Sequence, residues 1–127
     1  LYIGQGYSIY VPNEGWRLEE DINEGIQIDT WESTVNDDVE LCVLHLGERT
    51  LDQAQDWIIT EEEDFIFTED EQGNLLGTDR EDQKNIAVIF YSADNAMYAV
   101  QYTYPIEAAE GFGTRLSVIA STFEISN

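Results

Sequence analysis

The segment MYAVQYTYPIEAAEGFGTRLSVIASTFEI, residues 97–125, holds the clearest periodic patterns in the chain. Its first eight residues alternate, so Tyr98, Val100, Tyr102 and Tyr104 share one face of a strand. Pro105 ends this strand and suits the first turn of a helix. Apolar residues then recur at steps of three and four, which predicts a helix at about 105–122 lying on that tyrosine-bearing face. This stripe is Ala108 or Ala109, Phe112, Leu116, Ile119 and Phe123.

Two glycines interrupt the predicted helix, and a short strand follows it. Gly111 and Gly113 each disfavour the helix by roughly 1 kcal/mol relative to alanine. Because glycine has no side chain, we expect them to allow a close approach to the tyrosine-bearing face. Phe123-Glu124-Ile125 then predicts a short terminal strand.

Upstream, alternating segments are separated by turn residues. Asn13-Glu14-Gly15 and Asn23-Glu24-Gly25 are typical of turns, because Gly and Asn accept a positive φ. The alternation predicts an antiparallel meander with strands at 7–11, 16–18, 26–31 and 39–46.

The middle of the chain changes to a helical pattern. Thr50-Leu51-Asp52-Gln53 is a capping box, and Leu51, Ala54 and Ile58, with Trp57 beside them, form an apolar stripe. A helix is therefore expected at about 50–62. Two hairpins follow, turning at 70–74 and 93–96. The predicted class is α+β, a single domain over 1–127 with two helices packed on one face of an antiparallel meander, an α/β/α-type sandwich.

Composition excludes several functions. The chain has 27 Asp and Glu against 5 Lys and Arg, a net charge of −22, and residues 13–82 carry −20 of it. Such a surface repels nucleic acid and anionic lipid, so we expect neither as a direct partner. The 43% hydrophobic and 12% aromatic content provides a core, unlike a disordered acidic tail.

The two ends of the chain suggest a family. Gly6-Tyr7-Ser8-Ile9-Tyr10-Val11-Pro12 with Gly15-Trp16, and the final strand, helix and Ser121-Thr122-Phe123-Glu124-Ile125, resemble PsbP-like domains. That superfamily includes extrinsic proteins of the photosynthetic oxygen-evolving complex, Mog-type proteins and bacterial lipoprotein domains. The resemblance implies this fold and a binding or accessory role. It transfers no functional residue.

Catalytic motifs are missing from the sequence. It contains no GxGxxG, P-loop, GxSxG or HExxH pattern. Cys42 and His45 could pair as nucleophile and base, but their odd separation puts them on opposite faces of a strand. We expect Cys42 in the core and His45 facing the other layer or solvent. We therefore assign no catalytic, cofactor-binding or metal residues and no cofactor.

Carboxylate chemistry in an aromatic-lined cleft is one alternative. Asp29, beside Trp31, or Glu32 could serve as a catalytic acid if its environment shifted its pKa. Trp31, Trp57 and the tyrosines at 98, 102 and 104 could line a ligand groove. We favour solvated acidic strand edges and core packing of these aromatic residues.

Calcium binding is another alternative. Placing Gly73 at position 6 of an EF-hand loop puts Thr68, Asp70 and Gln72 at positions 1, 3 and 5, and Asp79 at position 12. Thr68 breaks the pattern, and a hairpin accounts better for this segment. Looser sites could form at 37–38 or 61–64. We expect no more than weak, non-specific binding of divalent cations.

The leading functional hypothesis is a non-catalytic extracytoplasmic accessory or protein-interaction domain of a bacterial surface lipoprotein or membrane-bound regulator. The chain starts at Leu1, so we expect a longer precursor whose signal peptide or anchor precedes this domain. A calcium-binding acidic module and a carboxylate-dependent hydrolase are the alternatives. A third class, an acidic mimic of nucleic acid, would need carboxylates spaced like phosphates along one face.

Overall fold

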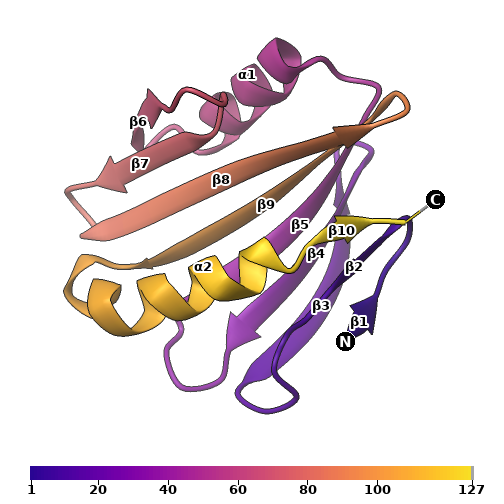
Figure 1. The fold of residues 1–127 in the computed structure, drawn as a ribbon. Coiled ribbons are helices and arrows are strands. Elements are labelled where there is room, and N and C mark those ends of the chain that lie inside the picture. The colour runs from indigo at the N-terminus through magenta and orange to yellow at the C-terminus, as the bar shows by residue number, and fades with distance from the viewer. Residues whose placement is uncertain (127) are drawn as a thin grey trace.

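A seven-stranded antiparallel sheet forms the centre of the protein (Figure 1). The computed structural model describes residues 1–126, except the side chains of residues 109 and 110. The strand order is β3-β4-β5-β9-β8-β7-β6. The bounds are β3 (Trp16–Asn23), β4 (Ile26–Ser33), β5 (Glu40–Gly47), β6 (Ile66–Glu69), β7 (Leu75–Asp79), β8 (Lys84–Ala93) and β9 (Ala96–Pro105).

The expected hairpins are confirmed, and their turns use positive φ angles. Glu24 and Gly25 join β3 to β4, and Asp94 and Asn95 join β8 to β9. All four have φ between 47° and 81°, as in the two-residue turns that suit twisted hairpins. The strand expected at 16–18 is longer than predicted, because β3 continues to Asn23 along the whole of β4.

The first strand lies outside the meander, so that part of the prediction is wrong. β2 (Tyr7–Ile9) lies between β1 (Tyr2–Ile3) and β10 (Glu124–Ile125) in a separate three-stranded sheet. Ser8 is the register partner of Glu124, and the Ser126 amide donates to the Gly6 carbonyl at 2.8 Å. The first and last strands of the chain therefore belong to the same small sheet. The terminal strand expected at Phe123-Glu124-Ile125 is present as Glu124–Ile125.

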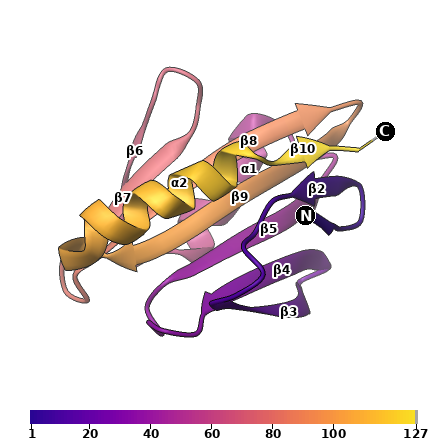
Figure 2. The same ribbon diagram turned by 60° about the horizontal axis from the view of Figure 1, so that its bottom comes forward.

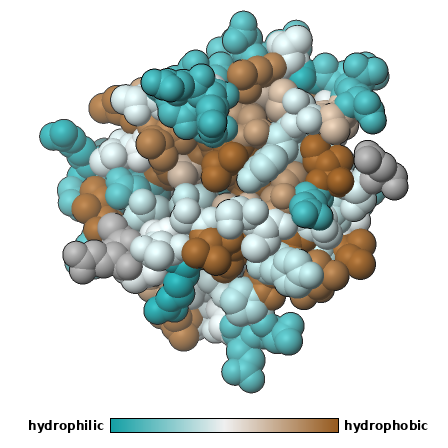
Figure 3. All heavy atoms as spheres, viewed as in Figure 1, coloured by the Kyte–Doolittle hydropathy of each residue, from teal (hydrophilic) through white to brown (hydrophobic). Residues whose placement is uncertain are grey.

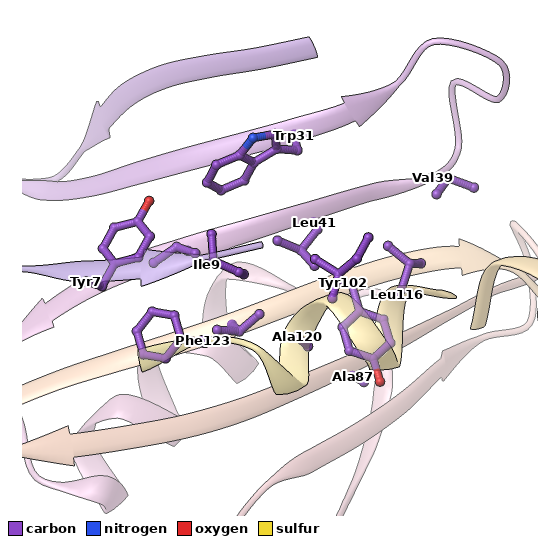
Figure 4. Close-up of a cluster of buried hydrophobic side chains, with 13 residues drawn as sticks. Tyr7, Ile9, Trp31, Val39, Leu41, Ala87, Tyr102, Leu116, Ala120 and Phe123 are labelled. Carbon is purple, nitrogen blue, oxygen red and sulfur yellow. The ribbon is translucent and has the colours of Figure 1, made fainter. Parts of the chain in front are cut away.

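The helices α1 (Leu51–Glu61) and α2 (Thr114–Ser121) cover opposite faces of the large sheet (Figure 2). Ala54 and Ile58 of α1 join a core cluster with Ile26, Leu44, Val88 and Ala99. Leu116, Ile119 and Ala120 of α2 join a second cluster with Trp31, Leu41, Val100 and Tyr102 (Figure 4). The α+β class and the α/β/α sandwich are confirmed, whereas placing both helices on one face is wrong. The central strands carry apolar side chains on both faces, and each face needs a cover.

The start of α1 follows the sequence closely. The Thr50 hydroxyl accepts from the Gln53 amide at 3.2 Å, and the Gln53 side chain accepts from the Thr50 amide at 2.9 Å. This is the expected capping box, and Glu62 is the C-cap.

The second helix is less regular than predicted. It lies on the Tyr98/Val100/Tyr102/Tyr104 face, as expected, but begins with a 3₁₀ turn over Ile106–Ala108 and a π-helical segment over Ala109–Gly113. A side chain at Gly113 would meet the Tyr104 ring at 3.3 Å, so this glycine does allow the expected close approach. The same expectation is wrong for Gly111, where an added Cβ would meet nothing within 4 Å. The side chain of Ala109, one alternative for the start of the stripe, lies outside the described residues.

Candidate functional site

A cleft of about 400 Å³ opens on the α1 face of the large sheet. Its floor is a row of polar side chains on three adjacent strands, because Thr30 is the register partner of Cys42 and Cys42 of Gln101. Apolar side chains and carboxylates form the walls. The wall residues are Asp21, Ile22, Asn23, Ile28, Glu40, Leu44, Trp57, Ile58, Glu61 and Glu62.

Gln101 is the most deeply placed polar group of this cleft. It is 5% exposed, and its Nε2 donates to Glu62 Oε1 at 3.1 Å. Its Oε1 is buried and has no hydrogen-bond partner among the described residues. A buried amide oxygen without a donor costs free energy, so the floor of the cleft holds an unused acceptor.

Two half-buried glutamates stand over this floor. Burial, and then Glu32, raises the pKa of Glu40 above its ordinary 4.5, although Lys84 opposes this. Burial also raises the pKa of Glu62, with Gln101 opposing and Glu40 adding to the rise. Acid–base catalysis needs two carboxyls whose pKa values are pushed apart. Here burial moves both pKa values in the same direction, so the two carboxyls are not differentiated in this way.

A second, acidic depression of about 220 Å³ adjoins the cleft and shares Glu40 and Glu62 with it. It unites the two looser cation sites considered from the sequence, because Asp37 and Asp38 lie around it together with Glu62 and Asp64. Lys84 Nζ lies 3.4 Å from Asp38 Oδ1. Within residues 1–126, no group of three or more His, Cys, Asp or Glu is arranged to hold a metal ion.

The segment weighed as an EF-hand loop is a hairpin. Thr68 lies in β6 and Asp79 ends β7. Asp70 Oδ1 accepts from the amides of Gln72 and Asn74 at 2.8 and 2.9 Å, so it stabilises the turn. Asp79 Oδ1 likewise accepts from two amides of the following turn.

Cys42 and His45 face opposite layers, as the alternation predicted. Cys42 is buried on the α1 face, where its Sγ lies 3.5 Å from Thr30 Oγ1, and burial raises the pKa of its thiol to about 12. His45 faces the small sheet, and its Nε2 lies 3.6 Å from Asp29 Oδ2. A nucleophile–base pair is therefore not formed by these residues.

Asp29 is fully buried between the two sheets, so the expectation of a solvated edge is wrong for this residue. The Tyr7 hydroxyl donates to Asp29 Oδ2 at 2.5 Å, and Gln27 Nε2 to Asp29 Oδ1 at 3.3 Å. The aromatic rings of Tyr7, His45 and Tyr98 pack against one another. The network ties β2 to the large sheet and lines none of the cavities described here.

The aromatic residues considered as the lining of a single ligand groove lie on opposite faces of the large sheet. Trp31 and Tyr102 belong to the core under α2, as expected. Trp57 lines the cleft on the other face. Glu32 is on the sheet surface, where its Oε2 accepts from Arg17 Nη2 at 2.6 Å.

An apolar groove of about 510 Å³ lies beside α2, against the turn before β3 and the end of β4. Val35 is 79% exposed and Val118 is 60% exposed, although both line this groove. Trp16 and Phe112 also line it, and Arg115 lies over the Phe112 ring, 5.1 Å from its centroid. On the molecular face in Figure 3, hydrophobic residues are interspersed with hydrophilic ones.

The sequence did not single out Gln101, Glu40 or the groove. Gln101 carried a signal, because it is a polar residue that follows Met97 and Ala99 on one strand face, although Thr103 shares that face. Glu40 carried none, because carboxylates occur throughout this part of the chain, and Glu62 was considered only as part of the looser cation site at 61–64.

The chain has the fold of PsbP-like domains. It is similar to the solution structure of cyanobacterial PsbP (CyanoP) from Synechocystis sp. PCC 6803, with a TM-score of 0.65 and 14% sequence identity. The likeness covers 94% of this chain and 86% of that chain. No protein-family model and no curated protein matches the sequence. In the described part of the chain, no helix is long and apolar enough to cross a membrane.

Proposed function

We propose that this domain is a non-catalytic extracytoplasmic accessory domain of a bacterial surface lipoprotein or membrane-bound regulator, and that it binds a basic protein partner. The observation that carries the proposal is the groove beside α2. Two strongly exposed valines, Val35 and Val118, extend its apolar lining to the surface. Exposed apolar grooves of this kind mark sites of protein interaction.

The charge of the domain defines the chemistry of the partner. A net charge of −22 favours association with a basic protein and opposes an acidic one. Glu14 and Arg115 both line the groove, so the attraction comes from the net charge of the whole domain. We therefore expect a segment that places an apolar side chain in the groove and carries lysine or arginine on either side.

A peptide selection tests this function. Peptides selected from a random library on the immobilised domain are expected to combine an apolar anchor with flanking basic residues. Val118→Lys places a charge in the groove and should weaken their binding by about tenfold or more. Ile66→Lys is the matched control, because Ile66 is 76% exposed on β6, away from the groove.

Two results would contradict the proposal. Selected peptides could bind the Val118→Lys and Ile66→Lys variants equally well, which would exclude the groove as their site. Alternatively, the selection could return no basic peptides, which would show that the negative charge of the domain does not select a basic partner.

A further inference from the structure

We propose that the cleft on the α1 face is a binding site for an organic ligand that carries a primary ammonium group on an alkyl chain. This site lies on the opposite side of the large sheet from the groove beside α2, and it does not depend on the function proposed above. The proposal rests on the acceptor at its floor, the apolar walls and the surrounding charge.

The floor of the cleft holds one hydrogen-bond acceptor that lacks a donor. Glu62 can only accept when it is ionised, so it takes the Nε2 end of the Gln101 amide and leaves Oε1 without a donor. That oxygen is buried and without a partner among residues 1–126. A primary ammonium has three N–H donors, which suits an amide oxygen beside carboxylates.

The charge of the walls selects a cation. Glu40 and Glu62 line the cleft, and Asp21 and Glu61 add two more carboxylates from β3 and α1. Burial disfavours the ionised forms of Glu40 and Glu62, and a bound cation would compensate for that cost. The neighbouring depression already holds such a pair, because the Lys84 ammonium lies 3.4 Å from the Asp38 carboxylate.

The remaining walls select an organic cation in place of a metal ion. Trp57, Ile28 and Leu44 present apolar surface. These side chains suit methylene groups, and an indole ring attracts a cation near its face. A calcium ion would need six to eight oxygen ligands, and the described residues provide no metal-ligand group at this cleft.

Two sources could supply this chemistry, a free polyamine or the lysine side chain of a protein. Isothermal titration calorimetry at constant ionic strength can compare them with two probes, spermidine and N-acetyl-lysine-N′-methylamide. We expect saturable binding of at least one probe at a single site, with a Kd below about 1 mM. Tighter binding of spermidine would indicate a free polyamine, and tighter binding of the lysine amide a protein side chain.

Variants locate the site. Glu62→Gln removes a negative charge and one of two acceptor oxygens, and Gln101→Leu removes the buried amide acceptor. Each should weaken binding by about tenfold or more. Glu124→Gln makes the same charge change as Glu62→Gln on β10, outside the cleft, and should alter affinity by less than about twofold. Val118→Lys should also alter the affinity for the probes by less than about twofold, because Val118 lies on the opposite side of the large sheet from the cleft.

Circular dichroism and thermal melting identify any variant that does not fold. If Gln101→Leu fails to fold, Glu62→Gln and Trp57→Phe test the cleft, because neither removes a buried hydrogen-bonded amide. Equal weakening by Glu62→Gln and Glu124→Gln would overturn the proposal, since it would mean non-specific attraction. Absence of saturable binding by both probes would overturn it as well.

Discussion

Replacing Tyr7 with phenylalanine should destabilise the protein through a single lost hydrogen bond. The Tyr7 hydroxyl donates to Asp29 Oδ2 at 2.5 Å, and both residues are 0% exposed. The phenylalanine ring can keep the packing of Tyr7 against Phe123 and Tyr98. The substitution therefore isolates the hydroxyl.

The size of the effect follows from what remains around Asp29. Gln27 Nε2 at 3.3 Å and His45 Nε2 at 3.6 Å are too distant to replace a bond of 2.5 Å. Loss of a hydrogen bond to a buried charged group costs about 1.5–3 kcal/mol. At about 4 °C per kcal/mol for a domain of this size, the Tm should fall by about 6–12 °C.

Thermal melting of Tyr7→Phe beside Tyr98→Phe measures this effect. The Tyr98 hydroxyl donates to the Gln5 carbonyl at 3.4 Å in an exposed position, so its loss should lower the Tm by less than about 2 °C. Adding Asp29→Asn to Tyr7→Phe should recover part of the loss, because it removes the unpaired buried charge. The reasoning is refuted if Tyr7→Phe costs no more than Tyr98→Phe.

Three further predictions concern charge and burial. The raised pKa of Glu62 means that the folded state holds its proton more tightly than the unfolded state, so this contribution to stability is lost as pH rises above 4.5 through the raised value. The Tm of Glu62→Gln should therefore exceed that of the wild type at neutral pH, and the difference should vanish on acidification. A difference in Tm that stays constant across pH would contradict this. Burial raises the pKa of the Cys42 thiol to about 12, so Ellman's reagent should react only after unfolding, and rapid reaction of the native protein would be inconsistent with it. The Tm should rise from low to moderate NaCl because salt screens the net charge of −22, and CaCl₂ at matched ionic strength should act equally; a rise at sub-millimolar calcium would reveal a specific site.

Local patterns were sufficient for most individual elements. The capping box of Thr50 and Gln53 can be recognised in the sequence alone, and it marks the start of α1. The alternation over 97–104 correctly assigned the two faces of β9, because side chains alternate along any strand.

Local patterns could not predict which distant segments pair with each other. The contact of Ser8 with Glu124 joins the two ends of the chain, and nothing in either segment selects the other as its partner. Alternation also says which residues share a face, but not which helix covers that face, so α1 was assigned to the wrong side.

The candidate sites were harder to predict for the same reason. The cleft combines side chains from β3, β4, β5, α1 and β9. Its carboxylates belong to a background of 27 acidic residues, so sequence spacing did not distinguish Glu40 and Glu62 from solvated neighbours. Burial distinguishes them, and burial depends on the assembled fold.

The central claim is that the acidic surface contains a defined ammonium site, and a nitrogen-15 NMR titration with spermidine at constant ionic strength tests it most directly. We expect saturable shifts concentrated at Glu40, Glu62 and Gln101, with a matching shift of the Trp57 indole N–H. The signals of α2 should remain unchanged. Shifts spread over the acidic residues of 13–82 without saturation would contradict the claim, because they would show only a diffuse attraction of cations.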